Sequence, residues 1–309
     1  MSVLTEERLF EPFIDATDGV LCLPAGSDEA EIERLAGLHG LRFPLLHDRG
    51  APLCDQVAAS PFAPASSRFG PYCDNITGMN WELPDGRRVR IGERVVKSTT
   101  GYDLLRFLLG TVGRYGRPVD YVLRLRPACE ESQTFFLRGD PVLLREAAAG
   151  ILRTSWIHWF DSVDVLEGGE FSSLLRVAVN CPAEECDAYL GFLSGIAARH
   201  GLSLDQSPGL PMDGCPDLVI KTSPEVLPDI VQLLSGEYGA KCVGLCYCGV
   251  VHVFLPGQNP DSICRIAQAM EPGLHAVGGD WSSRHVMPVN PDSPETEWIG
   301  KLKKEWNLP

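Results

Sequence analysis

The chain has 309 residues, of which 44% are hydrophobic and 22% charged, a composition typical of a globular protein with a sizeable core. Its formal net charge of −14 argues against nonspecific nucleic-acid binding, which needs a basic surface. No apolar run reaches the roughly 20 residues of a membrane-spanning helix, and the opening MSVLTEERLFEPF lacks the pattern of a secretory signal. We therefore expect a cytoplasmic protein of about two domains.

The beginning of the chain predicts a β-α-β unit. Met1 to Thr17 is an acidic and apolar leader that could form one helix. Gly19 to Pro24 is typical of a buried strand, and Ser27 is a good N-cap for a helix that Gly40 ends. Leu41 to Leu46 is the expected second strand.

Residues 68–127 hold the densest pattern in the chain. Met79 to Leu83 and Arg87 to Ile91 predict two strands, joined by the turn Pro84-Asp85-Gly86. An amphipathic helix follows at Leu104 to Leu109, and Val119 to Leu125 alternates like a returning strand.

Three glycines, Gly110, Gly113 and Gly116, separate that helix from the returning strand. They permit positive φ or a close approach of the backbone to a ligand. Taken alone, the glycines are explained better by a tight helix-to-strand connection, because glycine spacing is a weak signal.

The second half predicts the order β-α-β-β-α twice, which is typical of a tandem ferredoxin-like unit. The expected strands are Thr134 to Leu137, Val163 to Leu166, Ser172 to Val179, Leu218 to Lys221, Cys242 to Tyr247, Val250 to Leu255 and Ala276-Val277. The expected helices are a helix capped by Asp140 and running to Ile151, Glu184 to His200, Pro224 to Leu234, Asp261 to Met270 and a closing helix at Glu297 to Pro309.

The eleven cysteines are scattered, and without a secretory signal we interpret most of them as reduced core residues. The cluster Cys242, Cys246 and Cys248 has the spacing C-x3-C-x-C, with no obvious fourth ligand. Structural thiols explain it better than a metal or iron–sulfur site, and we expect no metal.

In residues 68–127 the chain resembles the FAD-binding domain of the vanillyl-alcohol oxidase / p-cresol methylhydroxylase (PCMH) type, most closely the FAD-binding accessory subunit of glycolate oxidase. The residues that carry the resemblance are Arg68-Phe69-Gly70, Asp74-Asn75-Ile76, Gly78, Leu83-Pro84-Asp85-Gly86, Arg94-Val95-Val96-Lys97, Gly101-Tyr102-Asp103-Leu104, Gly110-Thr111, Gly113, Gly116, Leu123-Arg124-Leu125 and Pro127.

The resemblance implies an α+β protein with a shortened FAD-binding PCMH-type domain at residues 1–128. A cap domain at residues 129–309 would follow, with a tandem ferredoxin-like (β-α-β-β-α-β) broad antiparallel sheet and a C-terminal helix that returns to the first domain. The chain departs from the family in its flavin loops. His47 to Leu53 has a single glycine and an aspartate where a pyrophosphate loop is expected, and Cys54 to Ser67 has serine, proline and alanine in place of glycines.

The resemblance also implies a set of FAD-binding residues: Arg68, Gly70, Lys97, Gly110, Thr111, Gly113, Gly116 and Val119. Lys97 could neutralise a flavin phosphate or pair with Asp103. Catalytic members of the family use histidines and an arginine of the cap on a 2-hydroxy acid, and the candidates here are His252, Arg284 and His285. His252 is explained more simply as a structural histidine in a strand.

These features lead to two hypotheses. In the first, the chain is an FAD-binding oxidoreductase subunit that resembles the glycolate oxidase accessory subunit. It would oxidise a 2-hydroxy acid in a complex with a larger flavoprotein subunit and an iron–sulfur subunit. In the second, it is a degenerate, non-catalytic homologue that has lost FAD and acts as a structural or binding subunit.

Overall fold

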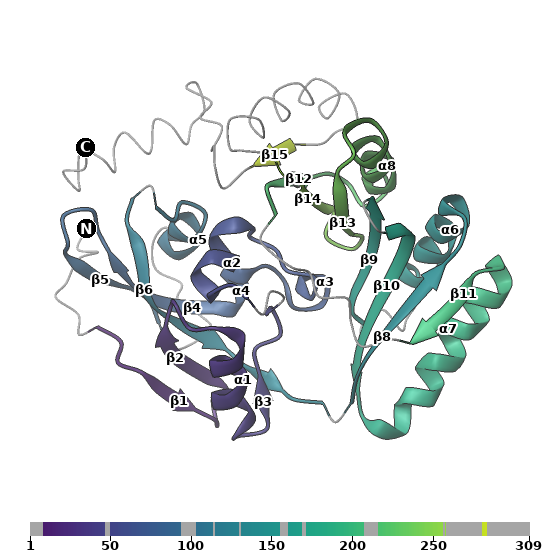
Figure 1. The fold of residues 1–309 in the computed structure, drawn as a ribbon. Helices are drawn as coiled ribbons and strands as arrows, with labels where there is room; N and C mark the ends of the chain where they lie inside the picture. Colours follow the sequence, from purple (N-terminus) through teal and green to yellow (C-terminus); the bar gives the residue numbers. More distant parts are fainter. Residues whose placement is uncertain are drawn as a thin grey trace.

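The computed structural model describes residues 9–46, 50–93, 103–113, 115–129, 131–154, 160–168, 171–206, 216–255, 257 and 280–282. In these residues the strands form one sheet of eight strands, one of five and one of two (Figure 1). Within the same part of the chain, no helix is long and apolar enough to cross a membrane. The helices predicted at Asp261–Met270 and Glu297–Pro309 lie outside these residues, as do the strand at Ala276-Val277 and Val95–Lys97.

The five-stranded sheet is antiparallel and has the order β1-β2-β6-β4-β5. Its strands are β1 (Phe13–Asp15), β2 (Val20–Pro24), β4 (Ile76–Glu82), β5 (Arg88–Gly92) and β6 (Arg117–Arg124). The predicted hairpin is confirmed, and its turn places Gly86 at φ +83°. The predicted leader helix is wrong at its end, because Phe13–Asp15 pairs with β2 as a strand.

Helices cover one face of this sheet. They are α1 (Glu29–Gly37), α2 (Leu53–Ala59), α3 (Ser66–Phe69), α4 (Tyr72–Asn75) and α5 (Leu104–Leu109). Apolar residues of α1, α2 and α5 pack with Leu21, Leu23, Trp81 and Tyr121 of the strands in one buried cluster. Alternate residues of the same strands, including Val20 and Cys22, face the other side and pack with Phe10. Successive side chains of these strands thus point to opposite faces of the sheet, and both faces are apolar.

Two local predictions near the start need correction. Asp28, and not Ser27, caps α1, because its Oδ1 accepts the Glu31 backbone N–H at 2.8 Å. The strand predicted at Leu41 to Leu46 is only Leu41–Arg42 (β3), and it pairs with β7 (Arg126–Pro127) in a separate two-stranded sheet. Pro44 lacks the N–H that a longer ladder needs. The expected β-α-β unit in one sheet is therefore not formed.

The eight-stranded sheet is also antiparallel, with the order β11-β8-β10-β9-β13-β14-β12-β15. Its strands are β8 (Glu131–Arg138), β9 (Phe160–Gly168), β10 (Phe171–Cys181), β11 (Ser203–Gln206), β12 (Leu218–Lys221), β13 (Lys241–Leu245), β14 (Val250–Phe254) and β15 (Asp280–Ser282). The broad antiparallel sheet that we expected after residue 129 is present.

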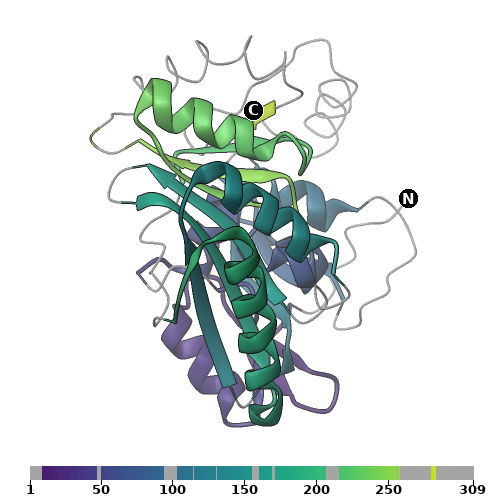
Figure 2. The ribbon, with the colours of Figure 1, turned by 90° about the vertical axis from the view of Figure 1, so that its right-hand side faces the viewer.

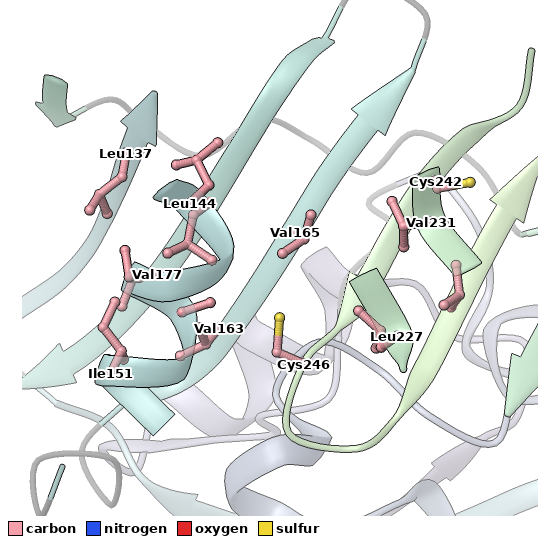
Figure 3. Packing of buried hydrophobic residues seen from close by; sticks show 14 of the residues in the cluster. Leu137, Leu144, Ile151, Val163, Val165, Val177, Leu227, Val231, Cys242 and Cys246 are labelled. Atoms are coloured by element: carbon pink, nitrogen blue, oxygen red, sulfur yellow. The ribbon is translucent and has the colours of Figure 1, made fainter. Parts of the chain in front are cut away.

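Three helices cover the outer face of this sheet, α6 (Pro141–Leu152), α7 (Cys186–His200) and α8 (Leu227–Tyr238), and they lie in front of it in Figure 2. Asp140 caps α6 as predicted, because its Oδ1 accepts the Val142 N–H at 2.8 Å. Leu144 and Ile151 of α6 pack with strand residues such as Val163 and Val177 (Figure 3). This face is a single apolar cluster that extends across both halves of the sheet.

The inner face of the sheet points toward the residues before β8. Its apolar side chains include Phe136, Leu166, Val243 and Val250, and Phe62 from the first part of the chain packs against them. The same face carries buried polar side chains, among them Asp164, Arg176, Asn180 and His252. The two sheets therefore meet at a surface that is only partly apolar.

Candidate functional site at the junction of the two sheets

Residues 60–69, here called the junction segment, connect α2 to the inner face of the large sheet. Serine hydroxyls shape its turns: Ser60 Oγ accepts the Phe62 N–H at 3.0 Å, and Ser66 Oγ accepts the Ala63 N–H at 2.9 Å. Ser67 Oγ donates to the carbonyl of Asp161 at 2.6 Å. The segment is thus attached to β9 by specific hydrogen bonds as well as by the Phe62 side chain.

Three arginines gather around the ring of Phe69, at the end of the junction segment. The guanidinium carbons of Arg42, Arg68 and Arg126 lie 5.5, 5.0 and 5.8 Å from the ring centroid. Arg126 also donates to Asn75 Oδ1 at 3.2 Å. We call Arg42, Arg68 and Arg126 the arginine cluster. It joins β3, α3 and β7, which are far apart in the sequence.

Asp161 of β9 holds two members of this cluster. Its Oδ2 accepts from Arg42 at 2.8 Å, its Oδ1 accepts from Arg68 at 2.7 Å, and Asn180 of β10 also donates to Oδ2. Asp161 is only 4% exposed, whereas the Arg42 and Arg68 side chains are 23% and 22% exposed. A buried carboxylate needs such partners, because its desolvation is costly. Arg42 and Arg68 thus pair with a buried carboxylate while part of each guanidinium side chain stays in contact with solvent.

The arginine cluster has three guanidinium groups against the one carboxylate of Asp161. Burial, together with the neighbouring Arg124 guanidinium, lowers the pKa of Arg126 below its ordinary value. Guanidinium groups present planar, paired donors that suit phosphate and carboxylate oxygens. The cluster can therefore bind an anionic group, although the chain as a whole carries a net charge of −14.

A buried ion pair lies deeper on the inner face of the sheet. Arg176 of β10 stands opposite Asp164 of β9 and donates to its Oδ2 from Nε at 2.9 Å and from Nη2 at 2.6 Å. Burial raises the pKa of the Asp164 carboxyl, and Arg176 opposes that rise. The pair is almost completely removed from solvent, which points to a structural role.

His252 lies on β14 and is fully buried on the inner face. Its Nε2 forms a 2.9 Å hydrogen bond with Ser60 Oγ of the junction segment. Lys221, on the neighbouring strand β12, places its Nζ 5.4 Å from the centre of the Phe62 ring. The structure thus puts this candidate catalytic residue against the chain's own junction segment.

The glycine loop after α5 is closed by its own hydrogen bonds. Gly110 N–H donates to Arg106 O at 3.3 Å, and Gly113 N–H donates to Gly116 O at 2.9 Å. Thr111 Oγ1 donates back to Phe107 O at 3.1 Å. Gly116, at φ +126°, lies where a side chain would collide with Trp81 Nε1 and the backbone of Glu82.

The remaining FAD-binding and catalytic candidates fall into three groups. Val119 lies on β6, where its carbonyl accepts the Ala25 N–H at 2.9 Å. Gly70 ends α3 at φ +80°, and a side chain there would meet Asp74 Oδ2 at 2.9 Å. Lys97, Arg284 and His285 lie outside the described residues.

The structure therefore brings the described candidates together in two places. Arg68, Gly70 and His252 all lie at or against the junction segment, whereas Gly110 to Val119 form the α5–β6 connection. Helix α4 joins the two places, because Asp74 accepts from Arg106 of α5 at 2.8 Å. Asp103, the partner considered for Lys97, caps α5 and pairs with Arg106 at 3.3 Å.

Sequence reasoning missed Arg42, Arg126 and Asp161. One signal was available: Asp161 and Asp164 are charged residues in an otherwise apolar strand pattern, FDSVDVLEG, and buried charges require partners. Nothing in the sequence indicates which arginines those partners are. Cys242 and Cys246 of the cysteine cluster are buried, and no group of three metal-binding side chains occurs within the described part of the chain.

Comparison with known proteins identifies relatives of part of the chain. It is 33% identical over 94 residues to the mitochondrial D-lactate dehydrogenase (cytochrome) of Arabidopsis thaliana, and 28% identical over 127 residues to a D-lactate dehydrogenase of Archaeoglobus fulgidus. These matches cover 30% and 40% of this chain but only 17% and 28% of the relatives. An uncharacterized FAD-linked oxidoreductase of Mycobacterium tuberculosis is 22% identical over 120 residues, which is 38% of this chain and 26% of that protein. No family model matches the chain.

The fold is similar to that of two solved structures of alkyldihydroxyacetonephosphate synthase. One has a TM-score of 0.61 at 12% identity and covers 96% of this chain and 63% of that chain. The other has a TM-score of 0.55 at 13% identity and covers 86% and 63%. The mixed α/β fold with antiparallel sheets thus resembles that of this synthase, and the relatives in sequence are two D-lactate dehydrogenases and a protein described as an FAD-linked oxidoreductase.

The described residues fit FAD in part. A flavin diphosphate needs positive charge and converging N–H donors. The arginine cluster supplies the charge, and its Arg42 and Arg68 remain partly exposed. The N–H groups of Gly110 and Gly113 already bond within their own loop. The arginine cluster is therefore the part of the described chain that fits the diphosphate best.

Proposed function

We propose that this chain is a subunit of an FAD-linked oxidoreductase that acts on a 2-hydroxy acid, of the same kind as the FAD-binding accessory subunit of glycolate oxidase. The observation that carries the proposal is the arginine cluster around Phe69, held by Asp161 at the junction of the two sheets. The partial identity to D-lactate dehydrogenases supports the substrate class.

In this proposal the arginine cluster binds the diphosphate of FAD, and Asp161 orients Arg42 and Arg68 toward it. Gly70 lets the chain leave α3 at positive φ beside the cluster. The loop from Gly110 to Gly116 and the strand at Val119 would contact the adenosine part, with Lys97 as a further cation. When bound, FAD supplies the two-electron acceptor for a hydride. His252, Arg284 and His285 remain the candidates for binding and deprotonating the acid.

The proposed arrangement has a shortened PCMH-type domain at residues 1–128 and a cap of two ferredoxin-like repeats at residues 129–309. In each half of the eight-stranded sheet the strands follow the order 4-1-3-2 or its mirror image, which supports the repeats. The partners would be a larger flavoprotein subunit and an iron–sulfur subunit, in the cytoplasm.

Titration of the purified chain with FAD, followed by flavin fluorescence, tests this proposal. We expect saturable binding, and at least a tenfold weaker affinity, or about 1.4 kcal/mol, in Arg126→Gln. Arg126 suits the test because it donates a hydrogen bond to neutral Asn75. The matched control is Arg138→Gln, on an exposed pair with Asp205. Equal affinities of the two variants would contradict the role of the cluster.

A specific observation favours a second function, that of a non-catalytic homologue that serves as a structural or binding subunit. The junction segment covers the inner face of the large sheet, and its Ser60 is bonded to the fully buried His252. In this case the purified protein is colourless and takes up no added FAD at any concentration. Co-purification with a larger flavoprotein tests the subunit role under both proposals.

A further inference from the structure

Two cysteines lie in contact where β10 passes into α7. Cys181 is the last residue of β10 and is buried, and Cys186 is the first residue of α7 and is partly exposed. Their Sγ atoms are 3.2 Å apart. A disulfide bond has a length of about 2.05 Å, so the sulfurs need to approach by only about 1.2 Å.

The turn between the two residues favours this approach. Pro182 and the short 3₁₀ helix η2 (Ala183–Glu185) bring the start of α7 back over the end of β10. Cys186 Sγ also lies 3.7 Å from the Pro182 carbonyl oxygen.

The surroundings give the two thiols different reactivities. Cys186 is partly exposed, so a reagent in solution can reach its sulfur, whereas Cys181 is buried. Burial, and then the hydrogen bond with Cys186, raise the pKa of Cys181 to about 12. Since the reagent can reach only the exposed sulfur, Cys186 is the attacking sulfur and Cys181 the resolving one.

In sequence, the pair directly follows a residue that contacts Asp161, the acid that holds two arginines of the cluster. Asn180, directly before Cys181, donates to Asp161, which in turn holds Arg42 and Arg68. A covalent bond between residues 181 and 186 would fix the end of the strand that carries Asn180.

We propose that Cys181 and Cys186 are a reversible dithiol–disulfide modification site that reacts with small disulfides such as oxidised glutathione. The Cys186 thiolate attacks one sulfur of the reagent, which forms a mixed disulfide and releases one glutathione thiolate. Cys181 then loses its proton and attacks Cys186 Sγ, which releases the second thiolate. The protein gives up two electrons and two protons, and the reagent becomes two molecules of glutathione.

Peptide mass mapping of the purified full chain tests the proposal, after incubation with oxidised glutathione or with dithiothreitol and then alkylation. We expect the oxidised sample to contain a linked peptide, two hydrogen atoms lighter, that joins Cys181 to Cys186, and the reduced sample to be alkylated at both. Unlinked peptides in both samples, or a link from Cys181 to the nearby Cys129, would overturn the proposal.

Two variants test the order of attack. Cys181→Ser removes the resolving thiol, so we expect a stable glutathione adduct on Cys186. Cys186→Ser should leave Cys181 without an adduct. Cys242→Ser is the matched control, because Cys242 is buried elsewhere in the same core, and it should give the same yield of the 181–186 link as the unmodified chain. Should a variant fail to fold, the mapping of the unmodified chain still decides the proposal.

Discussion

The two faces of the eight-stranded sheet are built from the same strands but have different chemistry. On the outer face, Val163, Val177 and Val251 pack under α6, α7 and α8 in one apolar cluster. On the inner face, the neighbouring positions hold Asp164, Arg176 and His252, all of them buried. Alternation along a strand thus separates a purely hydrophobic core from a polar contact surface.

The two faces differ because they pack against different parts of the chain. The helices of the outer face are joined to their strands by short connections, so apolar shape is enough to place them. The inner face receives residues from more than 90 positions earlier in the chain, as in the bond between Arg68 and Asp161. Directional polar contacts specify that arrangement at a cost in desolvation. The comparison therefore predicts which face tolerates which substitution.

The largest effect is expected for Arg176→Met, on the inner face. The variant leaves Asp164 buried without its cation, which should cost about 4 kcal/mol of unfolding free energy at pH 7. The folded-state pKa of Asp164 is already raised by burial. Loss of Arg176 raises it further, so Asp164 takes up a proton as the pH falls, and the deficit should shrink between pH 7 and pH 5.

Urea unfolding at the two pH values measures this effect. The double variant Asp164→Leu with Arg176→Met removes both charges, and we expect most of the lost stability to return. A double variant no more stable than Arg176→Met alone, or a deficit that does not change with pH, would contradict the assignment of a buried ion pair.

The next effect concerns the outer face. Leu227→Ala removes a fully buried side chain of α8 and should cost about 3 kcal/mol. Gly244 of β13 lies directly beneath it, because a Cβ there would meet Leu227 Cδ2 at 2.6 Å. Gly244→Ala alone is thus overpacked, but it should be tolerated better in the Leu227→Ala background.

A double-mutant cycle by thermal or urea unfolding measures that coupling. Leu38→Ala is the control, since Leu38 is 73% exposed, and it should change stability by less than about 0.5 kcal/mol. Strict additivity of Leu227→Ala and Gly244→Ala would mean that the two residues do not pack together.

Local elements were predictable from sequence and the long-range contacts of the inner face were not, for physical reasons. The Pro84-Asp85-Gly86 hairpin and the Asp140 cap depend on residues within a few positions of one another, and both predictions were correct. Helices α3 and α4 have four residues each, too few to show a helical period, and they were missed. Arg42 and Asp161 are 119 positions apart in the sequence, so only the three-dimensional fold brings them together.

The glycine loop illustrates the limit of a motif. Gly110, Gly113 and Gly116 were singled out for FAD, with a tight connection as the alternative. The structure shows what Gly116 does locally, since its lack of a side chain allows Trp81 Nε1 to donate to Tyr115 O at 3.1 Å. A glycine that packing requires can still border a ligand, so FAD binding by this loop stays a prediction.

A smaller effect is expected for Ser60→Ala, at the contact between the junction segment and the inner face. The variant removes the bond to His252 Nε2 together with the local bonds to the Phe62 backbone, and should cost about 2 kcal/mol. Urea unfolding measures the loss. Ser235→Ala, which removes an exposed serine hydroxyl, should change little. Equal stability of the two variants would show that the junction segment is not held by its hydrogen bond to His252.

The smallest effect is expected at the edge of the outer face, where Asp140 caps α6. Asp140→Ala removes the acceptor of the Val142 N–H and should cost about 1 kcal/mol. Asp140→Asn keeps an acceptor there and should lose only a small part of this. Hydrogen exchange in the first turn of α6 should quicken in the alanine variant, while exchange in β10 beneath it stays unchanged. Equally faster exchange in β10 would contradict this prediction. It would mean that α6 and the strand beneath it open together as one unit.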